Sequence, residues 1–185
     1  MDIVVLIVLA VLAVAVVAMY NSLVRRRNRV KQAYSGIEVQ LVQRYDLIPK
    51  LVETVKQYMT HERSLLEDIV RLRSEAMAGA SQEDKERADH ELTRALGQLR
   101  VSVENYPQLK ASDTFVQLQR SLNEVEEQLA AARRAFNGAV ADYNNAVQTF
   151  PSSMVAQAAG FKSRGMYVAE EHKRADVDMK QLFNA

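Results

Sequence analysis

Apolar side chains recur at alternating intervals of three and four residues along three long stretches of this chain. The longest unbroken series is Phe115, Leu118, Leu122, Val125, Leu129, Ala132, Phe136, Ala139, Tyr143, Ala146 and Phe150. Two shorter series are Ile37, Leu41, Tyr45, Ile48, Val52, Val55 and Met59, and Leu92, Ala95, Leu99 and Val103. Such spacing is typical of α-helices that pack on one another. It predicts an all-α protein in which the aromatic residues Phe115, Phe136, Tyr143 and Phe150 belong to the core.

A few helix-breaking residues separate these stretches. Gly79-Ala80-Ser81, Asn105-Tyr106-Pro107 and Phe150-Pro151 are the three breaks, and Ser81 is a suitable N-cap for the helix that follows it. We expect helices over about residues 20–78, 82–104 and 112–149. Because the connections are short, sequential helices should be antiparallel, which gives an up-and-down bundle of three long helices.

Pro49 lies inside the first of these stretches, where a proline costs a helix ~3 kcal/mol. Either the helix kinks at Pro49, or it stops and restarts there with Asp46 as a cap, which would give four helices. The apolar series continues past Pro49 without a change of phase, and this favours the kink.

Ahead of the bundle, residues 3–19 are all apolar. As a helix this run spans roughly 26 Å, and roughly 33 Å with the residues up to Val24, which matches the ~30 Å hydrocarbon core of a bilayer. It predicts an N-terminal transmembrane helix. A cleaved signal peptide is the alternative, since Ala13-Val14-Ala15 resembles a cleavage site. The run lacks a cationic n-region, however, and is longer than a usual h-region.

Five cations follow the apolar run: Arg25, Arg26, Arg27, Arg29 and Lys31. Lys and Arg near the end of a transmembrane helix are held on the cytoplasmic side. We therefore expect a single-pass membrane protein, with a short N-terminus outside and the bundle in the cytoplasm. Near an anionic leaflet each cation contributes ~1 kcal/mol of attraction, so these five residues are candidate lipid contacts.

The pattern divides the chain into four parts. They are a transmembrane anchor (1–24), a basic juxtamembrane segment (25–31), a helical bundle (32–151) and a C-terminal region (152–185). The last part allows three interpretations: a further helix that closes the bundle, an arm exchanged with a neighbouring copy, or a tail.

Charge and composition argue against several kinds of function. Without the five juxtamembrane cations and Asp2, the chain has 19 basic and 22 acidic residues. A basic stripe across the domain, as nucleic-acid binding would need, is therefore not expected. With no cysteine, three scattered histidines and neither a nucleophile elbow nor a phosphate loop, the sequence predicts no catalytic residue, no metal site and no cofactor.

Polar residues accompany the apolar series of the third helix at intervals of seven. Gln119, Glu126 and Arg133 follow this spacing beside the apolar series, and Asn137 and Asn144 do so on an adjoining face. Such positions can carry contacts between helices, but Gln119 and Glu126 are expected on a solvated face. Asp46 is a further candidate for a structural or interface role. The third helix is also much longer than the second, which leaves part of its apolar series for another segment or subunit.

Several short motifs follow one another in a recognisable order. The most distinctive are Arg44-x-Asp46-Leu47-Ile48-Pro49, Tyr106-Pro107-x-Leu109-Lys110, Ala132-Arg133-Arg134-x-Phe136-Asn137 and Tyr143-Asn144. In this order, and over nearly the whole chain, the sequence resembles the LemA family of bacterial membrane proteins. Lys50, Phe136 and the tail at 175–179 depart from the family pattern. The resemblance implies a single-pass anchor in the bacterial inner membrane, a cytoplasmic up-and-down bundle and no established enzymatic activity. It also implies structural polar contacts, within the bundle or between copies, for Arg133, Asn137 and Asn144, which fall in the family motifs.

The family includes a magnetosome protein that is associated with shaping internal membranes, so the resemblance makes membrane organisation the leading analogy. We therefore expect a non-catalytic, homo-oligomeric scaffold that contacts anionic lipids and organises the membrane. The alternative is a signalling or adaptor module that docks a membrane protease or another membrane partner. Fold and family do not by themselves fix either function.

Overall fold

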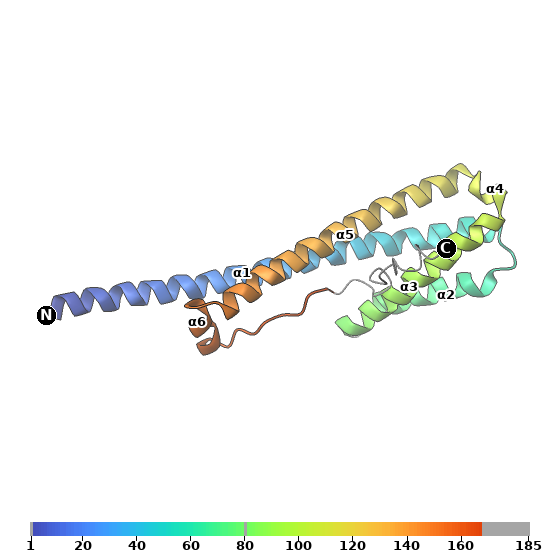
Figure 1. Ribbon diagram of the computed structural model, residues 1–185. Coiled ribbons are helices and arrows are strands. Elements are labelled where there is room, and N and C mark those ends of the chain that lie inside the picture. Colours follow the sequence, from blue (N-terminus) through green and yellow to red (C-terminus); the bar gives the residue numbers. More distant parts are fainter. Residues whose placement is uncertain (1, 80, 168–185) are drawn as a thin grey trace, which may run out of the picture. The chain divides into compact units, whose positions relative to one another are not determined.

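The computed structural model describes residues 2–79 and 81–167, and over these residues the chain is all helix and connections, without a strand. The long helices are α1 (Asp2–Lys56), α2 (Arg63–Ala78), α3 (Gln82–Ser102) and α5 (Asp113–Gln148). A short 3-10 turn, η1 (Val103–Asn105), and α4 (Pro107–Lys110) join α3 to α5, and α6 (Ser152–Ala158) follows α5 (Figure 1). The expected all-α bundle behind an apolar N-terminal helix is confirmed.

The described residues form two compact units, and α1 and α5 contribute to both. The bundle unit is Gln32–Arg134. The basic unit, named for its charge, combines residues 2–31 with residues 135–167. Residues 135–151, which the apolar pattern assigned to the bundle, pack in the basic unit.

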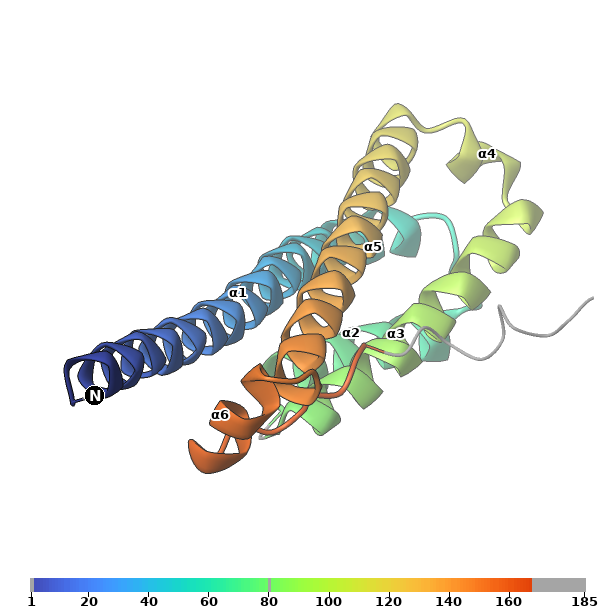
Figure 2. The same cartoon turned by 60° about the vertical axis from the view of Figure 1, so that its left-hand side comes forward.

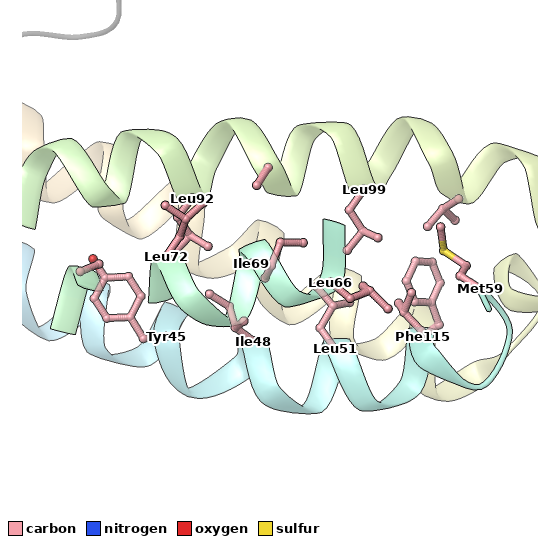
Figure 3. Packing of buried hydrophobic residues seen from close by; sticks show 14 of the residues in the cluster. Tyr45, Ile48, Leu51, Met59, Leu66, Ile69, Leu72, Leu92, Leu99 and Phe115 are labelled. Atoms are coloured by element: carbon pink, nitrogen blue, oxygen red, sulfur yellow. The ribbon is translucent and has the colours of Figure 1, made fainter. Parts of the chain in front are cut away.

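The bundle unit has the expected antiparallel order, with each helix reversing the direction of the one before it (Figure 1). Its core is built from the predicted series on α1 and α3, joined by an apolar face of α2. Figure 3 shows Tyr45, Ile48 and Leu51 of α1 facing Leu66, Ile69 and Leu72 of α2 and Leu92 and Leu99 of α3.

The first helix neither stops nor restarts at Pro49, so the alternative with a break there is wrong. The fourth helix arises elsewhere, because the stretch expected to run to residue 78 ends at Lys56 and resumes at Arg63. No glycine or proline marks this break. The signal is a lapse in the apolar series, since the positions three and four residues after the buried Met59 are Glu62 and Arg63.

The predicted cap of α3 is confirmed. Ser81 is the N-cap residue, and its hydroxyl accepts a 3.1 Å hydrogen bond from the backbone N–H of Asp84. The same hydroxyl donates to Oδ2 of Asp84 at 2.7 Å. This hydrogen bond is the main cause that lowers the pKa of the Asp84 carboxyl, and the Arg87 guanidinium nearby lowers that pKa further.

The C-terminal region contains the short helix α6 and then an irregular segment as far as Tyr167. The apolar residues Val168, Val177, Met179, Leu182 and Phe183, on which the three interpretations of the tail depended, lie outside the described residues.

Candidate functional site

The basic unit surrounds the point where the apolar run of α1 ends. From Tyr20 to Lys31 and from Ala135 to Tyr167 it has seven Lys and Arg residues against one acidic residue, Asp142. Within the part of the chain that the structure describes, one helix is long and apolar enough to cross a membrane: α1 has a mean hydropathy of 3.2 over its most apolar window, and none of that window is buried. A helix this apolar and this exposed is not the core helix of a soluble domain.

The five candidate lipid contacts fall into two groups. Arg25, Arg29 and Lys31 are exposed. Arg26 forms an ion pair with the Asp142 carboxylate on α5 and donates a second hydrogen bond, at 3.3 Å, to the backbone carbonyl of Asp142. Arg27 places its guanidinium carbon 5.2 Å from the centre of the Phe161 ring, within the range of a cation–π interaction. Three of the five therefore face solvent, and two are used in holding the unit together.

A turn after α6 places Phe161 in this contact. Gly160 has a φ of +72°, the left-handed conformation that glycine adopts without a steric penalty. Its N–H donates to the carbonyl of Gln157 at 3.2 Å, and the N–H of Phe161 donates to the carbonyl of Ala156 at 2.9 Å. These two hydrogen bonds define a Schellman motif. The motif directs Phe161 onto α1, where its ring meets that of Tyr20 edge-on at a centroid distance of 5.7 Å.

Asn137 and Asn144 bind the segment that follows this turn. The Asn144 side chain accepts from the N–H of Arg164 at 2.9 Å and donates to the carbonyl of the same residue at 2.8 Å. Asn137 does the same to Tyr167, accepting at 2.7 Å and donating at 2.9 Å.

We call each asparagine with its pair of hydrogen bonds an asparagine clamp. The distance between the two asparagines along α5 matches the distance between Arg164 and Tyr167 along the extended segment. Seven helical residues rise about 10.5 Å, and three extended residues span about 10 Å. Two asparagines two turns apart can therefore bind backbone groups three residues apart. The expectation of structural polar contacts at Asn137 and Asn144 is confirmed, and they lie within one chain.

The basic unit also covers the second half of the α5 apolar series. Phe136, Val140 and Tyr143 of α5 are buried there, as are Leu23 and Val30 of α1. The part of the series that seemed to be left for another segment or subunit is thus filled by the same chain. The core assignment of Phe150 is wrong, because this side chain lies beyond the end of α5 and is 75% exposed.

In the bundle unit, a buried arginine joins three helices. Arg44 of α1 is only 1% exposed. Its Nη1 donates to Oδ1 of Asp89 on α3 at 2.9 Å, and its Nη2 donates to the Thr93 hydroxyl at 2.9 Å. Its Nε lies 2.7 Å from Oε1 of Glu126 on α5, an ion pair without hydrogen-bond geometry. Glu126 is half exposed, but its expected role as a merely solvated residue is wrong.

Asp89, which is also 1% exposed, accepts hydrogen bonds from the other residues of this cluster. The Tyr45 hydroxyl donates to its Oδ1 at 3.1 Å, and Nη2 of Arg133 on α5 donates to its Oδ2 at 3.1 Å. A buried carboxylate is tolerated because charged and neutral donors satisfy both of its oxygens. The structural contact expected of Arg133 is confirmed.

Asp46 makes a weaker polar contact than Arg44, which lies two residues before it. Its carboxylate is exposed and lies 4.0 Å from the Arg73 guanidinium, at the limit of an ion pair. The central residue of the motif is therefore Arg44 rather than Asp46. A charged residue within the apolar series of α1, and an acidic one at the same kind of position on α3, were the sequence signal that could have identified this pair.

The described bundle residues also line open pockets, two of which have apolar linings. One of about 200 Å³ is lined by Arg44, Thr93, Leu96, Phe115, Gln119 and Leu122 among others. The other, of about 610 Å³, lies between the end of α1 and α2 and is lined by Val52, Met59, Leu66 and Val70, with Lys56, Arg63, Glu67 and Arg71 around them.

Comparison with known proteins agrees with this architecture. The model of the LemA family matches residues 33–180. Protein LemA of Metamycoplasma hominis is 26% identical over 165 residues, which cover 89% of this chain and 75% of that protein. Magnetosome protein MamQ of Magnetospirillum gryphiswaldense is 37% identical over 75 residues, 40% of this chain and 28% of MamQ. Magnetosome protein MamQ 2 of Paramagnetospirillum magneticum is 31% identical over 96 residues, 52% of this chain and 35% of that protein.

The chain thus spans only about a third of the length of its magnetosome relatives, whereas the family model matches most of the chain itself. The match extends over the bundle unit and the part of the basic unit that contains both asparagine clamps. This protein belongs to the LemA family.

Proposed function

We propose that this protein is a non-catalytic, membrane-anchored scaffold that organises the bacterial inner membrane. One observation carries the proposal: α1 is a single helix that contains an exposed apolar run at residues 3–19 and then supplies core residues to the bundle unit. A helix of 55 residues is about 82 Å long, more than twice what a membrane requires. The same helix therefore contributes both the apolar run and part of the bundle core.

The basic unit supports an orientation with the bundle in the cytoplasm. Lys and Arg close to the end of a transmembrane helix keep that end on the cytoplasmic side. The exposed residues Arg25, Arg29 and Lys31 are placed to contact anionic lipids at that surface.

Self-association of the anchored copies is the second part of the proposal. Support comes from Val39 and Val42, which lie about one turn apart on α1 in the bundle unit and are both exposed. The similarity to proteins named for the magnetosome supports a role in organising membranes.

Three measurements on the full chain test this proposal. Carbonate-resistant association with inner membranes would support the anchor, and protection of the bundle from protease in intact spheroplasts would support its orientation. Mass measurement in lipid nanodiscs should show more than one copy per particle, and a monomer at every concentration would rule out the self-associating scaffold. Tomography of cells that overproduce the protein should show altered inner-membrane shape, with a loss of that effect in Val39→Ser/Val42→Ser.

A signalling or adaptor role is the second candidate. The 610 Å³ pocket between α1 and α2 favours it, because its size and apolar lining suit a side chain from a docked partner such as a membrane protease. Crosslinking in cells distinguishes the two. An adaptor gives a stoichiometric complex that is lost in Val70→Asp, with membrane shape unaffected by overproduction, whereas a scaffold gives crosslinks between its own copies.

A further inference from the structure

The corner between α5 and α6 exposes two large apolar side chains. Phe150 is 75% exposed and Met154 is 65% exposed. In a soluble protein, isolated exposed apolar residues need no explanation. Here, however, both lie in the unit that surrounds the end of the apolar run of α1.

The corner is held in place from several sides. The Ser152 hydroxyl lies within hydrogen-bond distance of the carbonyl of Ala146 at 2.7 Å and of Thr149 at 2.9 Å. Ala156 is fully buried, and Met154, two residues earlier and so about 200° around the helix, faces away from that contact. The exposure of Met154 is therefore a consequence of how α6 is docked.

The helix register places this corner level with the end of the apolar run. In the basic unit α5 runs antiparallel to α1 (Figures 1 and 2), and Arg26 pairs with Asp142. Both helices rise by the same amount per residue. Phe150, eight residues beyond Asp142, is thus level with Ala18, eight residues before Arg26. The contact between Tyr20 and Phe161 gives the same level independently.

That level is where a bilayer changes from hydrocarbon to headgroups, because residues 3–19 fill most of the hydrocarbon thickness. Aromatic side chains are enriched at this depth. The cations around the corner, Arg25, Arg29 and Lys31 of α1 and Lys162 and Arg164 after α6, are all exposed. Beyond the apolar run, the unit has one acidic residue against seven basic ones, so this part of it is complementary to an anionic surface.

We propose that Phe150 and Met154 insert into the anionic leaflet from which α1 emerges, as a second, peripheral membrane contact beside the anchor. The chain would then be held at two points, which sets the angle of α1 to the membrane. This inference rests on the anchoring described under the proposed function.

The absence of cysteine from the chain makes a direct test simple, because each introduced cysteine is the sole labelling site. A fluorophore is attached to Met154→Cys in the otherwise unchanged full-length protein, reconstituted in vesicles of phosphatidylcholine and phosphatidylglycerol. A phospholipid with a nitroxide near its headgroup then quenches labels that contact lipid. Val101→Cys, an exposed apolar position on α3 of the bundle unit, is the matched control, and Val11→Cys reports on the anchor.

We expect the label at 154 to be quenched several-fold more than the label at 101, with a blue-shifted emission. Replacement of Phe150 by Ser in the same protein should reduce that quenching. Equal quenching at 154 and 101, with strong quenching at 11, would overturn the second contact while leaving the anchor intact. Weak quenching at 11 would instead overturn the anchoring itself.

Two further outcomes count against the proposal. A label at 154 that is protected from water but not quenched by lipid, with protection that rises with protein density, would show that a second copy covers the corner. Equal quenching at 154 in vesicles of phosphatidylcholine alone would remove the role assigned to the cations.

Discussion

The guanidinium Nε of Arg73 donates a 2.6 Å hydrogen bond to the backbone carbonyl of Tyr45. In an α-helix this carbonyl would accept from the N–H of the residue four positions later, which here is Pro49 and has no N–H. A side chain of α2 thus replaces the hydrogen bond that proline removes from α1. This is how α1 passes Pro49 without a break.

Replacing Arg73 by Leu should destabilise the protein by about 1–3 kcal/mol, since it leaves a partly buried carbonyl without a donor. Thermal unfolding followed by circular dichroism in detergent measures the change. In a Pro49→Ala background the same replacement should cost less, because residue 49 then supplies the missing N–H. Arg71→Leu is the control, as Arg71 pairs only with exposed acids on its own helix. Equal losses in both backgrounds would show that Arg73 stabilises the bundle in another way.

Asp89→Ala should cost about 3–5 kcal/mol, because it leaves the buried Arg44 charge without its main partner. Denaturant unfolding of the full chain in detergent checks this. The double variant Arg44→Met/Asp89→Leu should recover most of the loss, since apolar residues of similar size can replace a buried ion pair. Glu126→Gln, at the half-exposed end of the cluster, should have a much smaller effect. If the double variant is as unstable as Asp89→Ala, the cluster is needed for more than charge balance.

Asn144→Ala should speed hydrogen exchange at the amide of Arg164, and Asn137→Ala should do so at Tyr167. Each replacement removes both hydrogen bonds of one clamp, and a loss of ~1 kcal/mol corresponds to about fivefold faster exchange. Mass spectrometry of peptides from the segment 160–167 detects this. Asn145→Ala, at the exposed neighbouring position, should leave exchange unchanged. Uniform acceleration across all of α5 would indicate unfolding of the helix rather than release of the segment.

The start of α3 should show a pH dependence that can be traced to Asp84. Its pKa is lowered in the folded protein by the Ser81 hydroxyl, so its stabilising effect is complete above the ordinary carboxyl pKa of ~3.9. That effect is lost as the pH falls through the lowered value. The melting temperature of Asp84→Asn should therefore lie below that of the unchanged protein near neutral pH and approach it in acid. Ser81→Ala should reduce this pH dependence. If Asp84→Asn and the unchanged protein differ as much in melting temperature in acid as near neutral pH, the pH dependence does not come from Asp84.

Local signals in the chain were sufficient for much of this architecture. The alternating series on α1, α3 and the first part of α5 identified buried positions correctly, because a helix exposes the same face to its neighbours every three to four residues. The Ser81 cap and the breaks at Gly79 and before Pro107 followed from backbone chemistry that depends on neighbouring residues alone. Arg133, Asn137 and Asn144 were identified because they fall in the motifs that the sequence shares with the LemA family, whereas spacing alone left Gln119 and Glu126 on a solvated face.

Other features depend on residues far apart in the chain, and these only the tertiary structure decided. The pairing of Arg44 with Asp89 and the replacement of a backbone hydrogen bond by Arg73 both join different helices, so the local pattern can mark these residues as unusual but cannot specify their partners. Phe150 continues the apolar series, yet it is exposed because α5 ends at Gln148 and the chain turns there, so Phe150 no longer follows the buried face of the helix. The sequence by itself determined which residues form the apolar face of each helix. The packing of the helices decided which of these residues are buried, because burial requires a neighbouring element.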